Sequence, residues 1–278
     1  MEHNFSLGAP ARSREPMTIE QVRRAAPSAF AAEAYHEMSQ RYAYVPTGDV
    51  IAGMISAGFQ PFAASQSRAR LEDKREHTKH MIRFRAPDAE MVVGGIYPEV
   101  VLINSHDGTS AYKLLAGMFR LVCSNGLVVS ESMLASVSIR HSGDIIDQVA
   151  EASTGLIERM PLALEAVNEW QHTDLSPDQA MAYAEAAHTV RFADAHGDIA
   201  TPITPVQLLA RRRRDDGGSD LWNTFNRVQE NAIKGGLKAL KPGSRRVTRT
   251  RQVNGISEDV RLNRALWTLT ERMAQLVG

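Results

Sequence analysis

The order of hydrophobic patterns along the chain predicts an α+β protein, in which an antiparallel β meander packs with helices and a mainly helical C-terminal half follows. Short apolar segments separated by turn residues fill residues 81–130. After residue 143 the apolar residues recur with the helical period of about 3.6 residues. Strands therefore precede helices instead of alternating with them, which favours α+β over α/β.

The composition is that of a folded chain without disulfides. Of the 278 residues, 43% are hydrophobic and 23% are charged, which suits one large domain or two smaller ones. Cys123 is the only cysteine, so an intramolecular disulfide and a cysteine-built zinc site are excluded, and we expect a cytoplasmic protein. No apolar run reaches the roughly 18 residues that span a bilayer, so no membrane partner is expected.

The first two regions are an arm and a platform. Residues 1–30 show little periodicity and are expected to form a mobile N-terminal arm, with a short helix from Thr18 to Ala26. Residues 31–142 are predicted to form an α+β platform with an antiparallel sheet. It contains a helix that starts at Thr47 and stops at Gly58. The predicted strands are Tyr42 to Val45, Met81 to Arg85, Glu99 to Asn104, Tyr112 to Cys123 and Leu127 to Ser130.

Tight turns are expected between these strands. His106-Asp107-Gly108 and Asn125-Gly126 are the two candidate turns, because glycine accepts a positive φ at little cost. Strands joined by such turns pair antiparallel, so we predict a meander.

Residues 143–278 are predicted to be helical. A long helix starts at Ile145 and breaks near Pro161. Ser176 caps a helix that Pro177 begins and that ends near Phe192. Three more helices are expected over residues 205–213, 221–234 and 258–276, with an irregular basic segment before the last one.

The charge is unevenly distributed although 32 basic and 32 acidic residues balance over the chain. The basic segment, residues 205–252, holds 12 Lys and Arg against 4 Asp and Glu, and no acidic residue lies between Glu230 and Glu258. Unopposed cations favour a phosphate backbone through counterion release, whereas a solubilising surface usually mixes both signs. The sequence therefore predicts a nucleic-acid surface, with a solvated or internally paired patch as the alternative.

Aromatic rings are the second requirement for binding single strands, because bases stack on them. Phe84, between Arg83 and Arg85, and Tyr97 are the candidate platforms, although a ring in a strand usually lies in the core. Trp222, Phe225 and Trp267 are expected to be core residues. The candidate nucleic-acid-binding residues are Arg211, Arg212, Arg213, Arg214, Lys234, Lys238, Lys241, Arg245, Arg246, Arg249, Arg251, Arg83 and Arg85.

Enzymatic interpretations have less support. Asp107 could orient His106 as a general base, but adjacent residues in a tight turn point apart. Ser105, Ser110 or Cys123 could be nucleophiles with His106 or His141. The chain lacks a nucleophile elbow, a phosphate-binding loop and a dinucleotide fingerprint. Two Glu-x-x-His spacings, Glu33 with His36 and Glu185 with His188, match half of the ligands of a di-iron site. Such a site lies in a four-helix bundle, which the intervening strands do not fit. We expect no enzyme, no cofactor and no bound metal.

Two stretches resemble a known family in the order and spacing of their motifs. The first runs from Ile103 to Ala111, then from Phe119 to Leu127 and from Ser138 to Ser142; the second comprises Leu221 to Glu230 and Asp259 to Trp267. They resemble the family called domain of unknown function 932, and the resemblance covers about residues 42–275. Its members occur on phages, plasmids and integrated elements, which implies proximity to DNA metabolism. The layout is also similar in outline to the Redβ, RecT and Erf group of single-strand annealing proteins.

The expected function is that of a phage- or plasmid-type single-stranded DNA-binding protein, a homo-oligomer that could promote annealing in recombination without ATP. The alternative is a non-enzymatic interaction or regulatory protein of a mobile element that acts on a host protein. DNA versus RNA, and ring versus filament versus dimer, stay open at this point. So does the question of whether the basic segment is free or paired within the chain.

Overall fold

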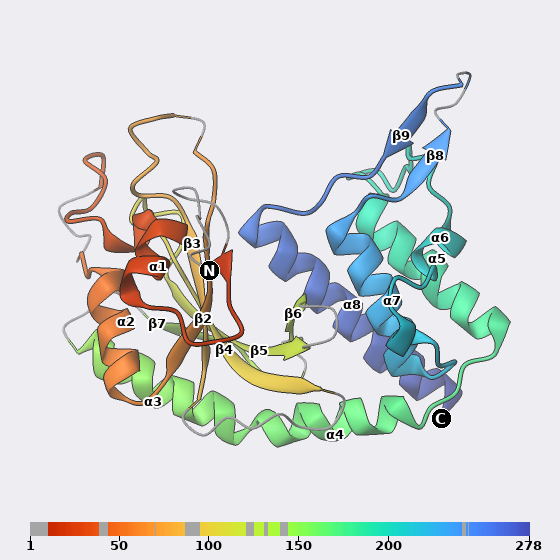
Figure 1. Cartoon of the computed structure of the whole chain (residues 1–278), viewed down its shortest axis with the longest axis horizontal. Helices are drawn as coiled ribbons and strands as arrows, with labels where there is room; N and C mark the ends of the chain where they lie inside the picture. Colours follow the sequence, from red (N-terminus) through yellow and green to blue (C-terminus); the bar gives the residue numbers. More distant parts are fainter. Residues whose placement is uncertain are drawn as a thin grey trace. The chain divides into compact units, whose positions relative to one another are not determined.

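The computed structural model describes residues 11–38, 44–69, 71–86, 95–120, 125–130, 133–139, 144–240, 243 and 245–278. The chain forms two compact units (Figure 1). The first unit comprises residues 1–119 and 134–161, and the second comprises residues 120–133 and 162–278. The first contains the sheet and the second is mainly helical, so the predicted α+β class is confirmed. The division differs from the expected boundary at residue 142, because the helix after that boundary belongs to the first unit.

The sheet of the first unit is antiparallel throughout its described register. β2 pairs with β3 from Gln60 opposite Arg85, and β3 pairs with β4 from His80 opposite Asn104. Its strands, in spatial order, are β1 (Ala11–Arg12), β2 (Gln60–Gln66), β3 (His80–Arg85), β4 (Ile96–Asn104) and β5 (Tyr112–Arg120), with β7 (Val137–Ile139) paired to β5. The predicted meander is confirmed, and β1, β2 and β7 are additional strands.

Helices pack on this sheet. α1 contacts β2, α2 contacts α3, and α3 contacts β4. The helices of the first unit are α1 (Ile19–Ala25), the short 3-10 helix η1 (Pro27–Phe30), α2 (Thr47–Ser56) and α3 (Ile145–Glu158). Gly58, with φ of 91°, lies just after α2 as expected.

The expected mobile arm is wrong for residues 11–30. β1 pairs with β2, and α1 has a complete capping box in which Thr18 and Gln21 satisfy each other's backbone N–H groups. Val22 and Ala29 are fully buried. The elements of residues 11–30 are short, so the sequence shows little periodicity there. Contacts with the sheet stabilise them. Residues 1–10 lie outside the described residues.

The second unit is a helical assembly around an aromatic core. α5, α7 and α8 pack against one another. Its helices are α4 (Met160–Gln171), which begins at the unit boundary, α5 (Pro177–Phe192), α6 (Pro205–Leu208), the 3-10 helix η2 (Arg214–Asp216), α7 (Leu221–Lys234) and α8 (Ile256–Val277). The expected core residues Trp222, Phe225 and Trp267 are buried, and the Trp170 and Trp267 ring centroids lie 4.8 Å apart.

Several local predictions are corrected. Asn125 and Gly126 do not form a turn but begin strand β6 (Asn125–Val128). The helix expected over residues 205–213 ends at Leu208. Tyr44 and Val45 lie in no strand, and Tyr42, Ala43 and Cys123 lie outside the described residues.

A buried ion cluster crosses the sheet of the first unit. The carboxylate of Glu99 on β4 accepts from Arg83 Nε at 2.6 Å and from Arg85 Nε at 3.3 Å, both on β3. The Arg85 guanidinium also lies over the rings of Phe62, at 3.8 Å from the centroid, and Tyr97, at 4.3 Å. Burial lowers the pKa of Arg85, and Glu99 opposes that effect.

A second buried polar group surrounds the hydroxyl of Thr47. Thr47 Oγ1 lies 2.9 Å from His80 Nε2, 3.2 Å from His106 Nε2, 3.0 Å from Asn104 Nδ2 and 3.0 Å from the Tyr112 hydroxyl. His80 Nδ1 lies 3.1 Å from the backbone oxygen of Thr78, which can only accept, so the ring proton belongs on Nδ1. Nε2 is then the acceptor for Thr47. Burial of this neutral ring lowers the pKa of His80 to about 4.

Replacing Glu99 by Gln should destabilise the first unit by about 3 kcal/mol, because two buried guanidinium groups lose their counterion. The free energy of unfolding, measured by far-UV circular dichroism in urea, tests this. Glu20→Gln is the matched control, since its partner Arg24 and Glu20 itself are both exposed and such a pair contributes roughly 0.3–0.5 kcal/mol. Equal losses in the two variants would contradict a buried ion cluster.

The free energy of unfolding should depend on pH through the protonation of His80. Its pKa of about 4 in the folded protein lies below the ordinary value of 6.5, so the unfolded chain binds the proton more tightly and stability falls as the pH falls below 6.5. The loss at pH 4 is about 3 kcal/mol relative to neutral pH. His80→Gln should lose less free energy of unfolding than the unmodified protein between pH 7 and pH 4. Parallel pH profiles would refute the assignment.

Candidate nucleic-acid interface

A β hairpin forms the most exposed part of the basic segment. Strands β8 (Lys238–Leu240) and β9 (Val247–Arg249) pair antiparallel, and Figure 1 shows them extending away from the helices of the second unit. The sequence indicated only an irregular segment here. The signal for a hairpin was nevertheless present, because a Pro-Gly dipeptide at Pro242 and Gly243 separates two short alternating stretches.

Two glycines direct the chain from α7 into the hairpin. Gly235 has φ of 61° and ψ of −147°, a combination essentially restricted to glycine. A Cβ at Gly235 would lie 2.7 Å from the backbone carbon and oxygen of Arg251. Gly236 also has a positive φ, 79°, but a Cβ there would meet no atom within 4 Å.

Backbone hydrogen bonds fix the base of the hairpin. Gly236 N donates to Thr250 O at 2.9 Å, and Thr250 N donates to Leu237 O at 3.0 Å. Gln207 Nε2 donates to Lys238 O at 2.7 Å, which ties β8 to α6. Gln207 therefore attaches the hairpin to α6, and the bonds of Gly236 and Thr250 close its base by joining its two arms.

Five exposed cations of the predicted set lie on the hairpin or, for Arg251, just after it. Four of the five are arginines, whose planar fork matches phosphate oxygens. These exposed residues, which we call the hairpin cations, are Lys238, Arg245, Arg246, Arg249 and Arg251. Lys241 was predicted with them but lies outside the described residues.

The predicted Arg211–Arg214 run is divided between structural and exposed side chains. Arg212 donates to Asn231 Oδ1 and to the backbone oxygen of Gly235, so it attaches this loop to the hairpin base. Arg213 and Lys234 both lie 2.9 Å from the carboxylate of Glu230. Arg211 and Arg214 are exposed. The sequence could not separate these roles, because the run was expected to end a helix that in fact stops earlier.

Glu230, the acidic partner of Arg213 and Lys234, is buried, with an exposed fraction of 1%. Its burial alone would raise the pKa of the carboxyl group. Hydrogen bonds from Arg213 and Lys234 outweigh that effect, and the pKa of Glu230 lies below its ordinary value. Arg213 and Lys234 therefore serve an internal carboxylate and are poor candidates for phosphate contacts.

Arg83 and Arg85 lie elsewhere, in the sheet of the first unit. Both are buried and hydrogen-bonded to Glu99. Phe84 is fully buried, so it offers no stacking surface, and Tyr97 packs on Arg85. This burial argues against a role for either arginine at a nucleic-acid surface, and we leave both out of the interface.

The enzymatic alternative gains nothing from the structure. His106 is fully buried with Nε2 at Thr47, whereas the Asp107 carboxylate accepts from the backbone N–H and the hydroxyl of Thr109 in the turn, so the two side chains point apart as expected. His141 lies outside the described residues. Within the described ranges, no three His, Cys, Asp or Glu side chains come together to hold a metal ion. His188 Nε2 donates to the backbone oxygen of Ile203 at 2.7 Å, because that oxygen can only accept.

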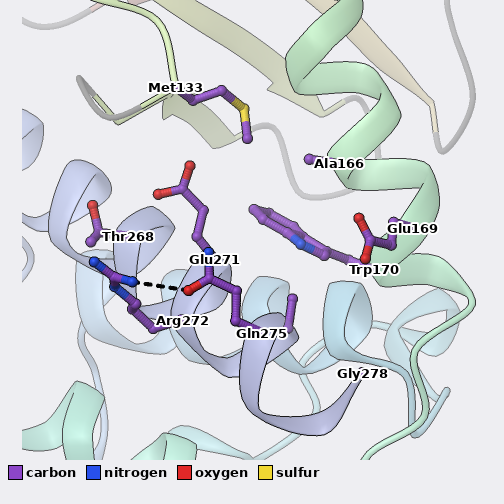
Figure 2. Close-up of a pocket in the computed structure, with 10 residues that line it drawn as sticks. Met133, Ala166, Glu169, Trp170, Thr268, Glu271, Arg272, Gln275 and Gly278 are labelled. Atoms are coloured by element: carbon purple, nitrogen blue, oxygen red, sulfur yellow. Dashed lines mark hydrogen bonds between the residues drawn. The ribbon is translucent and has the colours of Figure 1, made fainter.

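A pocket of about 460 Å³ opens between α4 and α8 of the second unit (Figure 2). Trp170 lies at its centre, and the carboxylate of Glu271 points toward Met133. Arg272 donates to Gln275 Oε1 at 2.9 Å, and Ser130 donates to Glu271 at 3.1 Å. Its described lining residues include no histidine or cysteine, so the pocket assembles no acid–base pair or metal site that we can assign.

None of the helices in the described part of the chain combines the length and the apolar composition that a bilayer crossing requires.

The two hairpin glycines should respond differently to alanine. Gly236→Ala introduces backbone strain of about 1–2 kcal/mol, whereas Gly235→Ala adds a collision with the Arg251 backbone and should cost more. All three tryptophans, Trp170, Trp222 and Trp267, belong to the second unit. Tryptophan fluorescence in urea therefore follows the unfolding of the second unit, and it measures the stability lost in the unit that contains both glycines. A Gly235→Ala variant as stable as Gly236→Ala would contradict the described hairpin base.

Comparison with known proteins defines the family. The pattern of the family described as Domain of unknown function (DUF932) matches residues 34–267. The UPF0380 protein YfjQ of Escherichia coli (strain K12) is 43% identical over 265 residues, which cover 94% of this chain and 93% of the relative. The UPF0380 protein YafZ of the same strain is 42% identical over 262 residues, with 94% and 93% covered.

No solved structure matches the chain significantly. The similarity to single-strand annealing proteins therefore stays a prediction. The predicted resemblance to the family called domain of unknown function 932 is confirmed. The chain belongs to the family described as Domain of unknown function (DUF932).

Proposed function

We propose that this protein binds nucleic acid, with single-stranded DNA as the first candidate, through the hairpin cations and without nucleotide hydrolysis. The observation that supports the proposal most is the exposure of all five hairpin cations in a stretch with no acidic residue between Glu230 and Glu258. Each cation that neutralises a phosphate releases condensed counterions, which favours binding.

The interface extends from the hairpin toward the preceding loop. Arg212 holds residues 211–213 against Gly235, so the exposed Arg211 belongs to the same region of the second unit as the hairpin base. Its guanidinium Nη1 lies close to Gly217. Arg211 and Arg214 are therefore secondary contacts in the proposal, after the hairpin cations.

In the proposed mode of binding, the hairpin cations contact the sugar-phosphate backbone and not the bases. No Phe, Trp or Tyr occurs between Phe225 and Trp267, so the hairpin has no ring on which a base could stack. A backbone grip leaves the Watson–Crick edges of the bases available, which is what promotion of annealing requires. Assembly as a homo-oligomer, with hairpins lined along one strand, belongs to the same proposal, as does a role in recombination on a mobile element.

Binding should weaken steeply with salt, and the hairpin should account for part of the slope. Lys238 and Arg249 are cross-strand neighbours, and replacing both by Gln removes two phosphate contacts. For a single strand the slope of log K against log salt should then become shallower by about 1.4. Fluorescence polarisation with labelled single-stranded and duplex oligonucleotides, at several ionic strengths, measures the slope.

The matched control replaces Lys113 and Arg159, which are exposed in the first unit, by Gln, with the same change in net charge. It should leave the slope unchanged. If the control lowers the slope as much as the hairpin variant, the effect is one of net charge and the interface is misplaced. Absence of any complex at low salt would overturn the proposal, and a host protein partner recovered without nucleic acid would then favour the interaction-protein alternative.

A further inference from the structure

An apolar pair lies among the hairpin cations. Leu240 and Val247 are 63% and 60% exposed, and they face each other across β8 and β9. Cross-strand apolar pairs stabilise a ribbon by only about 0.2–1 kcal/mol. The pair therefore contributes little to the stability of the ribbon and leaves two apolar side chains in reach of a ligand.

The strand pattern places this pair on the same face of the ribbon as two hairpin cations. Side chains alternate along a strand, and residues directly opposite share a face. The pair Lys238 and Arg249 therefore lies two residues from the apolar pair, on the same face. The spacing is about 7 Å along the strand, roughly two base steps of a duplex at about 3.4 Å each.

We propose that Leu240 and Val247 form a wedge that enters duplex DNA between adjacent base pairs and unstacks them, while Lys238 and Arg249 hold the flanking phosphates. This inference rests on the proposed function and adds the duplex as a second substrate. β ribbons of DNA-binding proteins enter the major or the minor groove, and apolar side chains that unstack a base step enter it from the minor groove. Leucine is one of the side chains that proteins insert at base steps, and Val adds a stiff, β-branched neighbour.

The charge and ring content of the hairpin favour DNA over a lipid surface. Side chains that anchor proteins in the membrane interface are commonly aromatic, and the segment between Phe225 and Trp267 has no aromatic residue. Four of the five hairpin cations are arginines, which pair with phosphates in a defined, bidentate geometry. These two observations favour duplex DNA over a lipid surface as the ligand of the apolar pair.

The anchoring of the hairpin suits it to this task. Unstacking one base step costs a few kcal/mol, and a free two-stranded hairpin is only marginally stable in water. Here the bond from Gln207 Nε2 to the backbone oxygen of Lys238 ties β8 to α6, and the bond from Gly236 to Thr250 closes the base of the ribbon. The hairpin can therefore stay folded when it binds, so that the free energy of its phosphate contacts can offset the cost of unstacking the bases.

A duplex with a fluorescent purine analogue, whose emission rises on unstacking, tests the wedge in the full-length protein. Binding should raise the emission, and the double variant Leu240→Ala/Val247→Ala should lose that rise at saturating protein. Its affinity for single strands and its salt slope should be unchanged. The matched control Leu162→Ala/Val206→Ala removes a leucine and a valine that are 54% and 53% exposed outside the hairpin, and it should retain the rise.

The outcomes separate the wedge from the proposed function. Saturable polarisation of the duplex without a rise in emission, or an equal rise with the double variant, overturns the wedge and leaves nucleic-acid binding intact. No polarisation change with any oligonucleotide overturns both. Vesicles of phosphatidylserine and phosphatidylcholine serve as the third arm. Sedimentation with vesicles that depends on Leu240 and Val247, together with an unchanged duplex emission, would overturn the wedge in favour of a membrane contact.

Discussion

A single buried carboxylate, that of Glu230, determines how the basic segment is divided. It is ionised inside the second unit because Arg213 and Lys234 donate to it, and these bonds outweigh the effect of burial on its pKa. The same contacts hold the loop after α6 against the last turn of α7, from which the hairpin begins. An acidic residue thus organises this part of the basic segment, since it pairs with two of its cations and holds the loop beside α7.

Much of the fold followed from local sequence chemistry. α5 and α7 have the predicted boundaries because their first turns are capped by the side chains of Ser176 and Asp220. Strands β3 and β4 were recognisable from their apolar content. By contrast, β2 has the sequence Gln-Pro-Phe-Ala-Ala-Ser-Gln, with no β-branched residue, and its strand conformation depends on pairing with β3. Such non-local pairing cannot be read from a propensity.

The candidate site was predictable in its charge but not in its geometry. The acid-free stretch identified the hairpin cations, because charge density is a property of the sequence alone. The burial of Arg83 and Arg85 could not be predicted because Glu99, which pairs with them, is distant in sequence and meets them only through strand register. The exposure of Leu240 was missed for a similar reason. An apolar residue is assigned to the core by default, and only its 63% exposure separates it from the core.

The aromatic surroundings of Arg85 have a consequence for how the sheet assembles. Its guanidinium is enclosed by rings from β2, β4 and β5, those of Phe62, Tyr97 and Phe119. A slip of one residue would turn the side chain to the opposite face and away from all three rings and from Glu99. Misaligned pairings would therefore strand a positive charge in an apolar interior. The contacts of this one arginine therefore favour the native strand register over registers shifted by one residue.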